Sequence, residues 1–313
     1  MGKCLSKKVK SFSEKECLSR KAQAKLAFEL KGEGFRLKDI FIVVGIPEAS
    51  YHYLVKQLDR ADPDTELKSC ITALFKQFHE RYGYKRITNE LRKLGYVINH
   101  KKVYRLMQTL GLKCVKFMRK SRKYNSYRGH VGKVAKNRLA RRFSTPIPLQ
   151  KLVTDITEFK CLGEEKLYLN PILDLYNGEI ITFEINKRPT LDLVMNPLHA
   201  AMDIIKARAT YRTTIHSDQG WHYQHNHWVR TLKQNRIFQS MSRKATCADN
   251  AAMENFFGLL KQEMYYGEAL VSYDALKQRI ETYIHWYNHE RSKQKLAGMS
   301  PVEYRTHTSQ SVS

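Results

Sequence analysis

This sequence has no long apolar run and no closely spaced cysteines, and it has few acidic residues for its length. No run approaches about 18 apolar residues, which excludes a membrane-spanning helix. The six cysteines lie at least 13 positions apart, which excludes paired zinc-finger spacings and predicts reduced thiols. Residues 1–19 contain lysines but no apolar stretch, unlike a signal peptide. We therefore expect a cytoplasmic protein that does not span a membrane.

Charge is strongly unbalanced along the 313 residues. The chain has 30 Asp and Glu against 55 Lys and Arg, a formal net charge of +25. Such a surplus destabilises the compact state by self-repulsion unless a polyanion compensates it. Nucleic acid is the first candidate partner, an acidic membrane the second, and a basic protein without a polyanionic partner remains the alternative. Hydrophobic residues make up 42% of the chain, enough for buried cores, and the length predicts two or three structural units.

Residues 1–64 are predicted to be helical. A polar helix is expected over 14–31, an amphipathic one over 36–44 and a third over 47–58. Gly45 separates the last two, and a helix, a short turn with glycine and a second helix form the pattern of a helix-turn-helix. The same pattern also arises from plain helix packing, so the sequence leaves both interpretations open.

Residues 65–112 predict a small helical DNA-binding unit. Helices are expected over 66–80, 84–94 and 99–110, with glycines at the two junctions. The apolar residues expected to form their shared core are Leu91, Leu94, Val103, Leu106 and Leu110.

A basic linker is predicted over 113–146. Residues 113–142 contain twelve Lys or Arg and no acid, with three aromatic residues interleaved. This composition is typical of a segment that follows a phosphate backbone, and it also fits a solvated tether. The residues that we expect to contact DNA are Arg119, Lys120, Arg122, Lys123 and Arg128.

Residues 147–305 change to an α/β pattern, followed by a tail over 306–313. Three strand-like segments come first, and helices and strands then alternate. This order predicts a mixed five-stranded sheet with helices on both faces. The expected strands are 149–159, 166–175, 179–186, 213–216 and 237–240, and the expected helices are 190–209, 223–234, 249–266 and 272–290.

Three carboxylates in this region are candidates for catalysis. Asp155 lies inside the first predicted strand, where a charge is costly unless it is paired or bound to metal. Asp218 directly follows a short strand, at the end where α/β sheets bind their ligands. Glu254 lies on a predicted helix beginning at an N-cap, Asp249, at the edge of its apolar face. Three acids from separate segments suit two hard cations that assist phosphodiester cleavage and transfer.

The helix that carries Glu254 also predicts a DNA-facing stripe. Asn250 and Lys261 fall on the same side as Glu254 by the 3.6-residue period. We expect both side chains to contact DNA beside the active site. An ordinary exposed lysine is the alternative for Lys261.

The sequence around these acids resembles that of bacterial insertion-sequence transposases of the retroviral-integrase-like superfamily. Asp218 and Glu254 have 35 residues between them, as in the Asp-Asp-35-Glu pattern. The specificity comes from the surrounding motifs, and the resemblance covers roughly residues 66–305. Those motifs are Val-Thr-Asp-Ile-Thr at 153–157, His-Ser-Asp-Gln-Gly-Trp at 216–221, Asp-Asn-Ala-Ala-Met-Glu-Asn-Phe-Phe at 249–257, Tyr-Gly-Tyr-Lys-Arg-Ile at 82–87, Tyr-Asn-His-Glu-Arg at 287–291 and Ser-Pro-Val-Glu-Tyr at 300–304.

The resemblance implies an RNase H-like integrase core that is preceded by helix-turn-helix-like segments. It implies a polynucleotidyl transferase with two Mg²⁺ or Mn²⁺ ions held by Asp155, Asp218 and Glu254. It also implies a second-frame product that acts on element ends and target DNA, in a fusion or together with a first-frame helix-turn-helix protein. We further expect a homo-oligomer associated with the nucleoid. An RNase H-like nuclease without strand transfer and an inactive DNA-binding regulator are the alternatives.

Several other polar and aromatic residues attract attention. His222, His225 and His227 crowd one segment, but no Cys or acid lies at ligand spacing, and we expect a polar helix surface. Trp221, like the other two tryptophans, is expected in the core. Arg291 either contacts phosphate or caps the last turn of its helix, and the sequence leaves that choice open.

Overall fold

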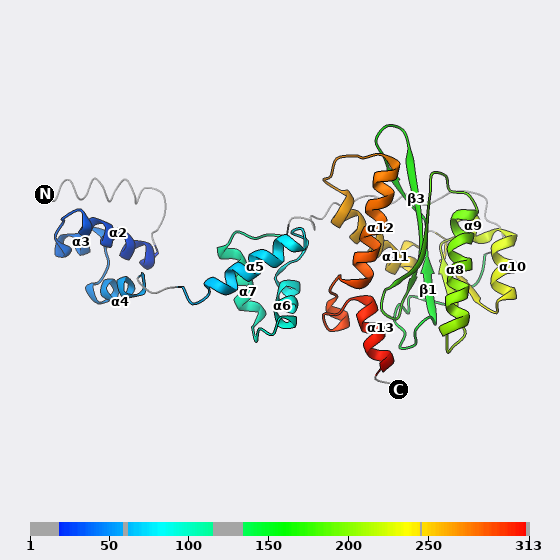
Figure 1. The fold of residues 1–313 in the computed structure, drawn as a ribbon, viewed down its shortest axis with the longest axis horizontal. Coiled ribbons are helices and arrows are strands. Elements are labelled where there is room, and N and C mark those ends of the chain that lie inside the picture. Colours follow the sequence, from blue (N-terminus) through cyan, green and yellow to red (C-terminus); the bar gives the residue numbers. More distant parts are fainter. Residues whose placement is uncertain (1–18, 59–61, 115–133, 245, 311–313) are drawn as a thin grey trace. The chain divides into compact units, whose positions relative to one another are not determined.

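The computed structural model describes residues 19–58, 62–114, 134–244 and 246–310 (Figure 1). Its chain divides into two compact units, residues 1–70 and residues 71–313. None of the described helices combines the length and the apolar character that a bilayer crossing requires. The predicted DNA contacts of the basic linker lie outside the described residues. They concern Arg119, Lys120, Arg122, Lys123 and Arg128.

In the described residues 19–58 of the first unit, three helices surround a small core. They are α2 (Arg20–Gly32), α3 (Leu37–Val44) and α4 (Glu48–Leu58). Gly45 ends α3 in the left-handed conformation at a φ of 72°, which favours glycine because it lacks a Cβ atom. Ala27, Ile40 and Tyr51 are among the residues buried between the helices. The predicted pair of helices around Gly45 is confirmed.

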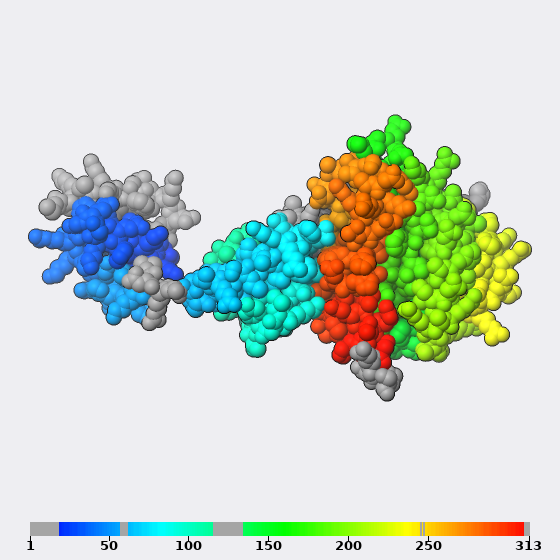
Figure 2. Space-filling view, in the orientation of Figure 1, coloured from blue at the N-terminus to red at the C-terminus, as the bar shows by residue number. Residues whose placement is uncertain are grey.

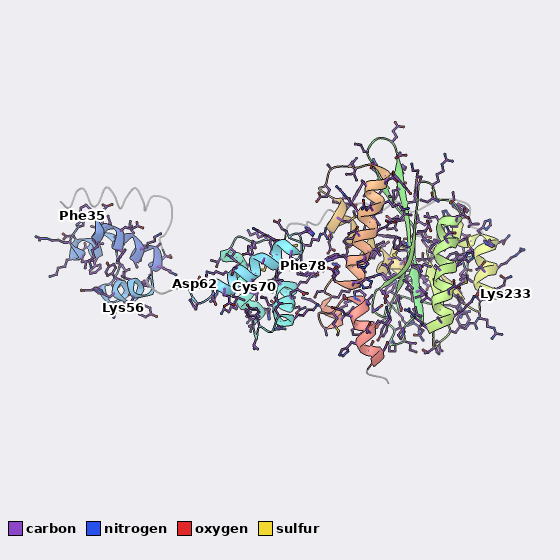
Figure 3. All side chains as sticks on the ribbon, viewed as in Figure 1. Phe35, Lys56, Asp62, Cys70, Phe78 and Lys233 are labelled. Atoms are coloured by element: carbon purple, nitrogen blue, oxygen red, sulfur yellow. The ribbon has the colours of Figure 1, made fainter. Side chains whose placement is uncertain are left out.

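Three further helices precede the sheet. They are α5 (Thr65–Gln77), α6 (Tyr84–Lys93) and α7 (His100–Thr109). Leu91, Val103 and Leu106 are buried as predicted, whereas Leu94 is 60% exposed, because it lies beyond the end of α6 at its C-cap. Figure 3 shows the side chains of this region and labels Phe78, the residue after the end of α5. The ring of Phe78 stacks on that of Tyr82, with ring centroids 4.2 Å apart.

Six strands form one mixed sheet in the part of the chain that the structure describes. The order is β4, β3, β1, β5, β6, with β2 also paired to β3. The prediction of five strands was wrong in one respect: the first one is interrupted at Asp155 and Ile156. Both halves still pair with β3 in one continuous antiparallel register, Thr154 facing Ile172 and Thr157 facing Leu169. The strands are β1 (Lys151–Thr154), β2 (Thr157–Lys160), β3 (Lys166–Asp174), β4 (Ile180–Asn186), β5 (Thr214–Ser217) and β6 (Phe238–Met241).

Helices cover both faces of this sheet (Figure 1). On one face, Leu152 and Ile172 pack with side chains of α8 (Asp192–Arg208) and with Trp228 of α10 (Asn226–Gln234). On the other face, Val153 and Leu173 pack with α11 (Ala251–Leu260) and α12 (Tyr273–His289). The predicted fold class, a mixed sheet between two helical layers, is confirmed. Figure 2 shows the close-packed surface of this region.

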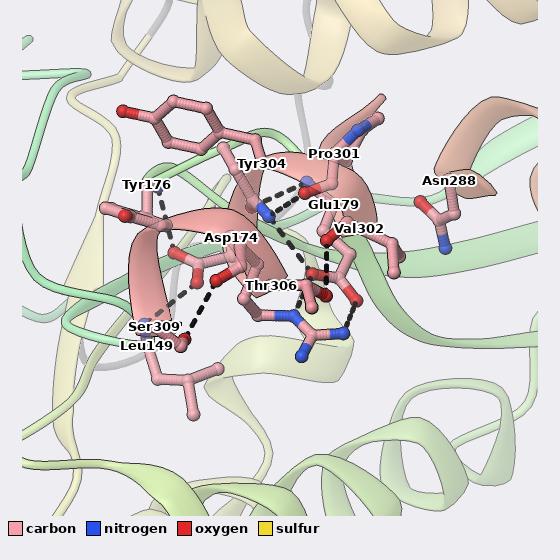
Figure 4. Close-up of polar contacts among 12 residues, drawn as sticks. Leu149, Asp174, Tyr176, Glu179, Asn288, Pro301, Val302, Tyr304, Thr306 and Ser309 are labelled. Carbon is pink, nitrogen blue, oxygen red and sulfur yellow. Dashed lines mark hydrogen bonds and ion pairs between the residues drawn. The ribbon is translucent and has the colours of Figure 1, made fainter. Parts of the chain in front are cut away.

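The chain end packs against the turn between β3 and β4 (Figure 4). Arg305 of α13 (Pro301–Gln310) forms a two-point ion pair with Glu179, at 2.8 and 3.2 Å. Tyr176 donates a hydrogen bond from its hydroxyl to Thr308 at 2.8 Å. These contacts attach α13 to the sheet, although it lies more than a hundred residues from the turn.

The helix predicted over 249–266 is divided into three pieces. A 3-10 turn, η1 (Cys247–Asn250), precedes α11, and a π-helical turn, η2 (Lys261–Tyr265), follows it. In η2, the backbone N–H of Tyr266 donates to the carbonyl of Lys261, five residues earlier, at 2.7 Å. The wide turn accompanies the burial of Glu263, which is fully enclosed and paired with Arg291.

Candidate active site

Asp155 and Asp218 lie at the carboxyl ends of two neighbouring parallel strands. In the register between β1 and β5, Val153 faces His216. Asp155 lies two residues after Val153, and Asp218 lies two residues after His216. Both aspartates therefore lie at the same edge of the sheet. Loops at this edge are the ligand-binding position of open α/β sheets.

Local hydrogen bonds hold each of these two carboxylates. Asp155 accepts a bond from the backbone N–H of Ile156 at 2.8 Å, in the interruption between β1 and β2. Asp218 accepts one from the backbone N–H of Gly220, also at 2.8 Å. A Cβ atom on Gly220 would lie only 3.0 Å from Oδ1 of Asp218, so a glycine lets the turn approach the carboxylate closely.

Glu254 reaches this region from α11. Met253 and Phe256 bury one face of the helix in the core. The side-chain amide of Asn250, at the start of α11, donates to the backbone carbonyl of Thr154 at 3.3 Å, directly before Asp155. Glu254 itself is exposed. The helix therefore presents a solvent-accessible carboxylate beside two partly buried ones.

The three acids influence one another electrostatically. Burial raises the pKa of Asp155 well above its usual value, and the charges of Asp218 and Glu254 raise it further. Lys261 opposes this shift by lowering the pKa of Asp155. Burial also raises the pKa of Asp218, and partial loss of solvent around the exposed Glu254 raises the pKa of that residue. A site with these shifts favours a cation, because a positive charge stabilises the ionised forms.

The donor set fits a hard divalent cation in its chemistry. All three side chains offer only carboxylate oxygens, which Mg²⁺ and Mn²⁺ prefer. Across the described residues, no three His, Cys, Asp or Glu side chains converge closely enough to form a metal cluster. The charges of Asp218 and Glu254 both raise the pKa of Asp155, so Asp155 lies near both of the other acids. These residues fit ions that also require oxygen ligands from water or substrate.

Asp249 fixes the chain immediately before α11. It was expected to cap the helix, and this was wrong, because Arg243, Arg141 and Asn137 occupy its carboxylate. Arg243 binds both oxygens at 2.9 and 3.0 Å, and Arg141 binds one at 2.9 Å. The hydrogen bond from Arg243 is the main reason that the pKa of Asp249 lies well below its usual range. The carboxylate of Asp249 is buried, whereas both arginines are largely exposed, and these ion pairs position the N-terminus of the helix that carries Glu254.

Asn250 and Lys261, the two predicted DNA-contacting residues that flank α11, lie in different surroundings. The Nζ atom of Lys261 lies 5.0 Å from the centre of the Phe159 ring, close enough to Asp155 to lower the pKa of that residue. Asn250 is buried, with 4% of its surface exposed, and its amide is bound to the backbone of Thr154. We therefore keep Lys261 and leave Asn250 out of the DNA-facing surface that we propose.

Two nearby residues depart from what the sequence suggested. Trp221, three residues after Asp218, is 48% exposed and stacks on His222. It is exposed because α9 (Trp221–Gln224) is a single turn with one outward face. His222 is buried and bound to the carbonyl of Pro189 at 2.7 Å, so it does not form a polar surface.

Sequence reasoning missed the polar network beneath the acids. The side-chain oxygen of Asn170 accepts hydrogen bonds from Thr154 and Tyr223, both at 2.9 Å. Burial raises the pKa of Tyr223 well above its usual value, with smaller contributions from Asp155 and Asp218. The available signal was a polar residue in the middle of β3, Asn170, and another at the end of β1, Thr154, since buried polar side chains in strands are rarely unpaired.

Arg291 follows neither of the interpretations that the sequence left open. Its guanidinium binds Glu263 at 2.6 and 2.9 Å, and only 2% of the residue is exposed. Tyr283 donates a further hydrogen bond to Glu263 at 2.7 Å, and Arg86 lies 3.5 Å from it. The arginine therefore neutralises a buried acid at the end of the α11–η2 segment.

Comparisons with known proteins identify three family regions. Two models described as integrase core domain match residues 145–247 and 254–308, and one described as an HTH-like domain matches residues 62–121. The chain is 40% identical to the putative transposase InsK for insertion sequence element IS150 of Escherichia coli strain K12, over 88% of this chain and 95% of the relative.

Other relatives are also transposases or transposase-like proteins. An uncharacterized transposase-like protein of Haemophilus influenzae is 48% identical over 67% of this chain and 94% of its own length. Transposase InsF for insertion sequence IS3A of Escherichia coli is 33% identical over 75% of this chain and 81% of the relative. Among solved structures, the HTLV-2 integrase catalytic core domain in complex with magnesium aligns with a TM-score of 0.38 at 16% identity, over 50% of this chain and 97% of that one. The relatives at 40% and 33% identity are matched over most of their length, and the chain belongs to the family of insertion-sequence transposases with an integrase core domain.

Proposed function

We propose that this transposase cleaves and joins DNA at Asp155, Asp218 and Glu254, with two Mg²⁺ or Mn²⁺ ions held between them. The observation that supports the proposal most directly is geometric. Asp155 and Asp218 follow paired positions of the parallel strands β1 and β5, and Asn250 ties the start of the helix that carries Glu254 to Thr154, next to Asp155. Three carboxylates from separate segments at one edge of the sheet suit divalent cations, whose remaining oxygen ligands water and DNA would supply. When bound, such ions activate the attacking oxygen and stabilise the leaving one.

The side chains of the protein hold and orient the reacting groups. Asp155 and Asp218 are fixed by backbone N–H donors on the ends of β1 and β5. Glu254 is carried by a helix whose start is bound to β1 through Asn250. In the first reaction a water oxygen attacks the phosphorus at the element end and releases a 3′-hydroxyl. In the second reaction that hydroxyl attacks a target phosphodiester, forms the new bond and displaces a 3′-oxygen.

We further propose that cationic side chains hold the DNA beside these acids. Lys261 lies near Asp155 and suits a phosphate that flanks the scissile one. Residues Arg119, Lys120, Arg122, Lys123 and Arg128 belong to a segment without acids, whose composition suits phosphate contacts.

The proposal extends to the working assembly. We infer a homo-oligomer that acts on two element ends and a target. The chain would function in a fusion or alongside a first-frame helix-turn-helix protein.

The decisive experiment compares the purified chain with Asp155→Asn, Asp218→Asn and Glu254→Gln on labelled element-end DNA. Each variant should lose both cleavage and strand transfer by roughly a hundredfold or more, about 2.7 kcal/mol of transition-state stabilisation, while DNA binding persists. The losses should not add in double variants, because the acids act as a unit. A chelator should abolish activity and added Mg²⁺ or Mn²⁺ should restore it.

Two results would contradict parts of this proposal. Strand transfer that survives in any of the three variants would remove that residue from the active site. Cleavage without transfer by the unaltered chain would favour a nuclease of the same fold.

A further inference from the structure

A cavity lies apart from the three acids. Its volume is about 1420 Å³, and Asp155, Asp218 and Glu254 are not among the residues that line it. Its wall includes the start of α6, residues 143–146, the end of β3 with the turn that follows it, the side of α11 that contains Asn255, and residues 293–296. The cavity therefore adjoins both the helical region matched as HTH-like and the helix that carries Glu254.

The wall of this cavity is cationic. The described residues that line it include six Lys and Arg but no Asp or Glu. Acids close behind the wall are already paired, Glu263 with Arg291 and Glu179 with Arg305. Lys85 and Lys295 are exposed, so their charges face solvent. The six residues are Arg81, Lys85, Arg86, Arg291, Lys293 and Lys295. Arg86 and Arg291 already face Glu263, and burial lowers the pKa of Lys293 well below its usual value. The positive charge that the wall offers to a ligand therefore comes from Arg81, Lys85 and Lys295.

The first turn of α6 adds a further positive contribution. Gly83 is its N-cap and supplies no side-chain oxygen to the backbone N–H groups of that turn. The turn contains no acid, and Lys85 and Arg86 occupy positions where a cation opposes the helix dipole. An anion bound at this end would relieve that opposition, because the backbone N–H groups at the start of a helix and the helix dipole both favour negative charge.

Arg81 has an unused donor next to the same turn. Its Nε atom is buried and has no hydrogen-bond partner, and its guanidinium lies 5.2 Å from the ring centre of Trp286. A buried N–H group without a partner is costly and uncommon. A bound acceptor would satisfy it.

From these observations we propose that the cavity binds the sugar-phosphate backbone of a DNA strand, as a site separate from the catalytic acids. The inference rests on the proposed function, since it assigns part of the DNA path of the transposase. The cavity is larger than the ~300–1,000 Å³ of small-molecule pockets, which favours a polymer over a single small anion. Residues 113–142 of this chain are a poor occupant, because they are themselves cationic and contain no acid.

The test uses the full chain in a chelator, so that binding is measured without chemistry. Affinity for a fixed DNA duplex is determined over a salt series for Lys85→Ala/Lys295→Ala. Loss of two phosphate contacts should reduce the log–log slope by about 1.8, or about 0.9 for each contact. The control is Lys206→Ala/Lys277→Ala, which removes one exposed and one half-exposed lysine outside the cavity and should leave the slope close to that of the unaltered chain.

Alkylation of Cys114 gives an independent readout, because this half-buried thiol lines the cavity. DNA should slow its modification in the unaltered chain but not in Lys85→Ala/Lys295→Ala. An unchanged slope together with unprotected Cys114 would overturn the inference. The proposed function would still stand if the unaltered chain bound and cut DNA. Equal protection by inorganic phosphate, at the same phosphate concentration, would also overturn the inference by identifying a small-anion site.

Discussion

Asp174 and Asp155 are both carboxyl groups at strand ends, yet their surroundings differ. Asp174 accepts hydrogen bonds from two backbone N–H groups, those of Leu149 at 2.8 Å and Tyr176 at 3.0 Å (Figure 4). Asp155 accepts one such bond and has two other carboxylates nearby. The first arrangement closes a turn, whereas the second leaves charge uncompensated, as expected for a site that binds a cation.

Asp174 gives a prediction about pH and stability. Burial raises its pKa from 3.8 to about 6, with Glu179 raising it further and Arg305 opposing. Between these two values the unfolded chain releases the proton more readily than the folded one, so stability falls as pH rises through this window. The advantage of the unaltered chain over Asp174→Asn should therefore shrink by up to roughly 3 kcal/mol between pH 4 and pH 7. Urea unfolding at several pH values measures this difference, and a constant difference would contradict the prediction.

Lys261 gives a prediction about cleavage. Lys261→Ala should weaken end-specific cleavage about tenfold, or about 1.4 kcal/mol, through the loss of a cation beside the reacting phosphate. Thermal stability should hardly change. Lys277→Ala is the matched control, since Lys277 is exposed on α12 and pairs only weakly with Glu281 at 4.0 Å. Equal cleavage by the two variants would mean that Lys261 does not face DNA.

At the scale of elements, one buried ion pair joins the α11–η2 segment to the end of α12. Burial alone would raise the pKa of Glu263, but Arg291 and Tyr283 outweigh it and lower the pKa. Arg291 lies just beyond α12, and the neighbouring Ser292 donates its backbone N–H to Tyr82 at 3.0 Å. The same small region therefore holds the helical segment around α6 against the core.

This ion pair predicts a large loss of stability. Glu263→Gln should destabilise the chain by about 3–5 kcal/mol, because it leaves the charge of Arg291 buried without its partner. Glu281→Gln, on the exposed side of α12, should cost less than about 0.5 kcal/mol. Chemical denaturation of both variants tests this, and similar stabilities would show that the pair contributes little.

Helix pattern was a good guide to these elements where the period stayed regular. It placed α12 within one residue at each end, but it joined η1, α11 and η2 into one helix. A π-helical turn leaves no signature in apolar spacing, because it depends on a contact with a distant residue, here Arg291. The interruption at Asp155 was also missed, because β-forming residues continue on both sides of it.

At the scale of the whole molecule, the formal charge of +25 favours a polyanionic partner, and we propose that DNA is that partner. The segment around Arg119 should account for part of the salt dependence of binding. Replacing Arg119, Lys120, Arg122 and Lys123 with Ala should reduce the log–log slope by about 0.9 for each phosphate contact that is lost. Affinity measured across a salt series decides this, and a slope equal to that of the unaltered chain would indicate a tether without DNA contacts.

The sequence by itself determined the family, the fold class and the three candidate acids, because each acid lies in a short, specific motif. It could not determine burial or partners between distant segments. Asn250 and Arg291 lie in motifs as specific as that of Glu254, yet the tertiary structure encloses both. The cationic cavity likewise exists only in the folded chain, because its wall combines residues from 81 to 304. Local pattern encodes which elements form, whereas the environment of a charge depends on what packs around it.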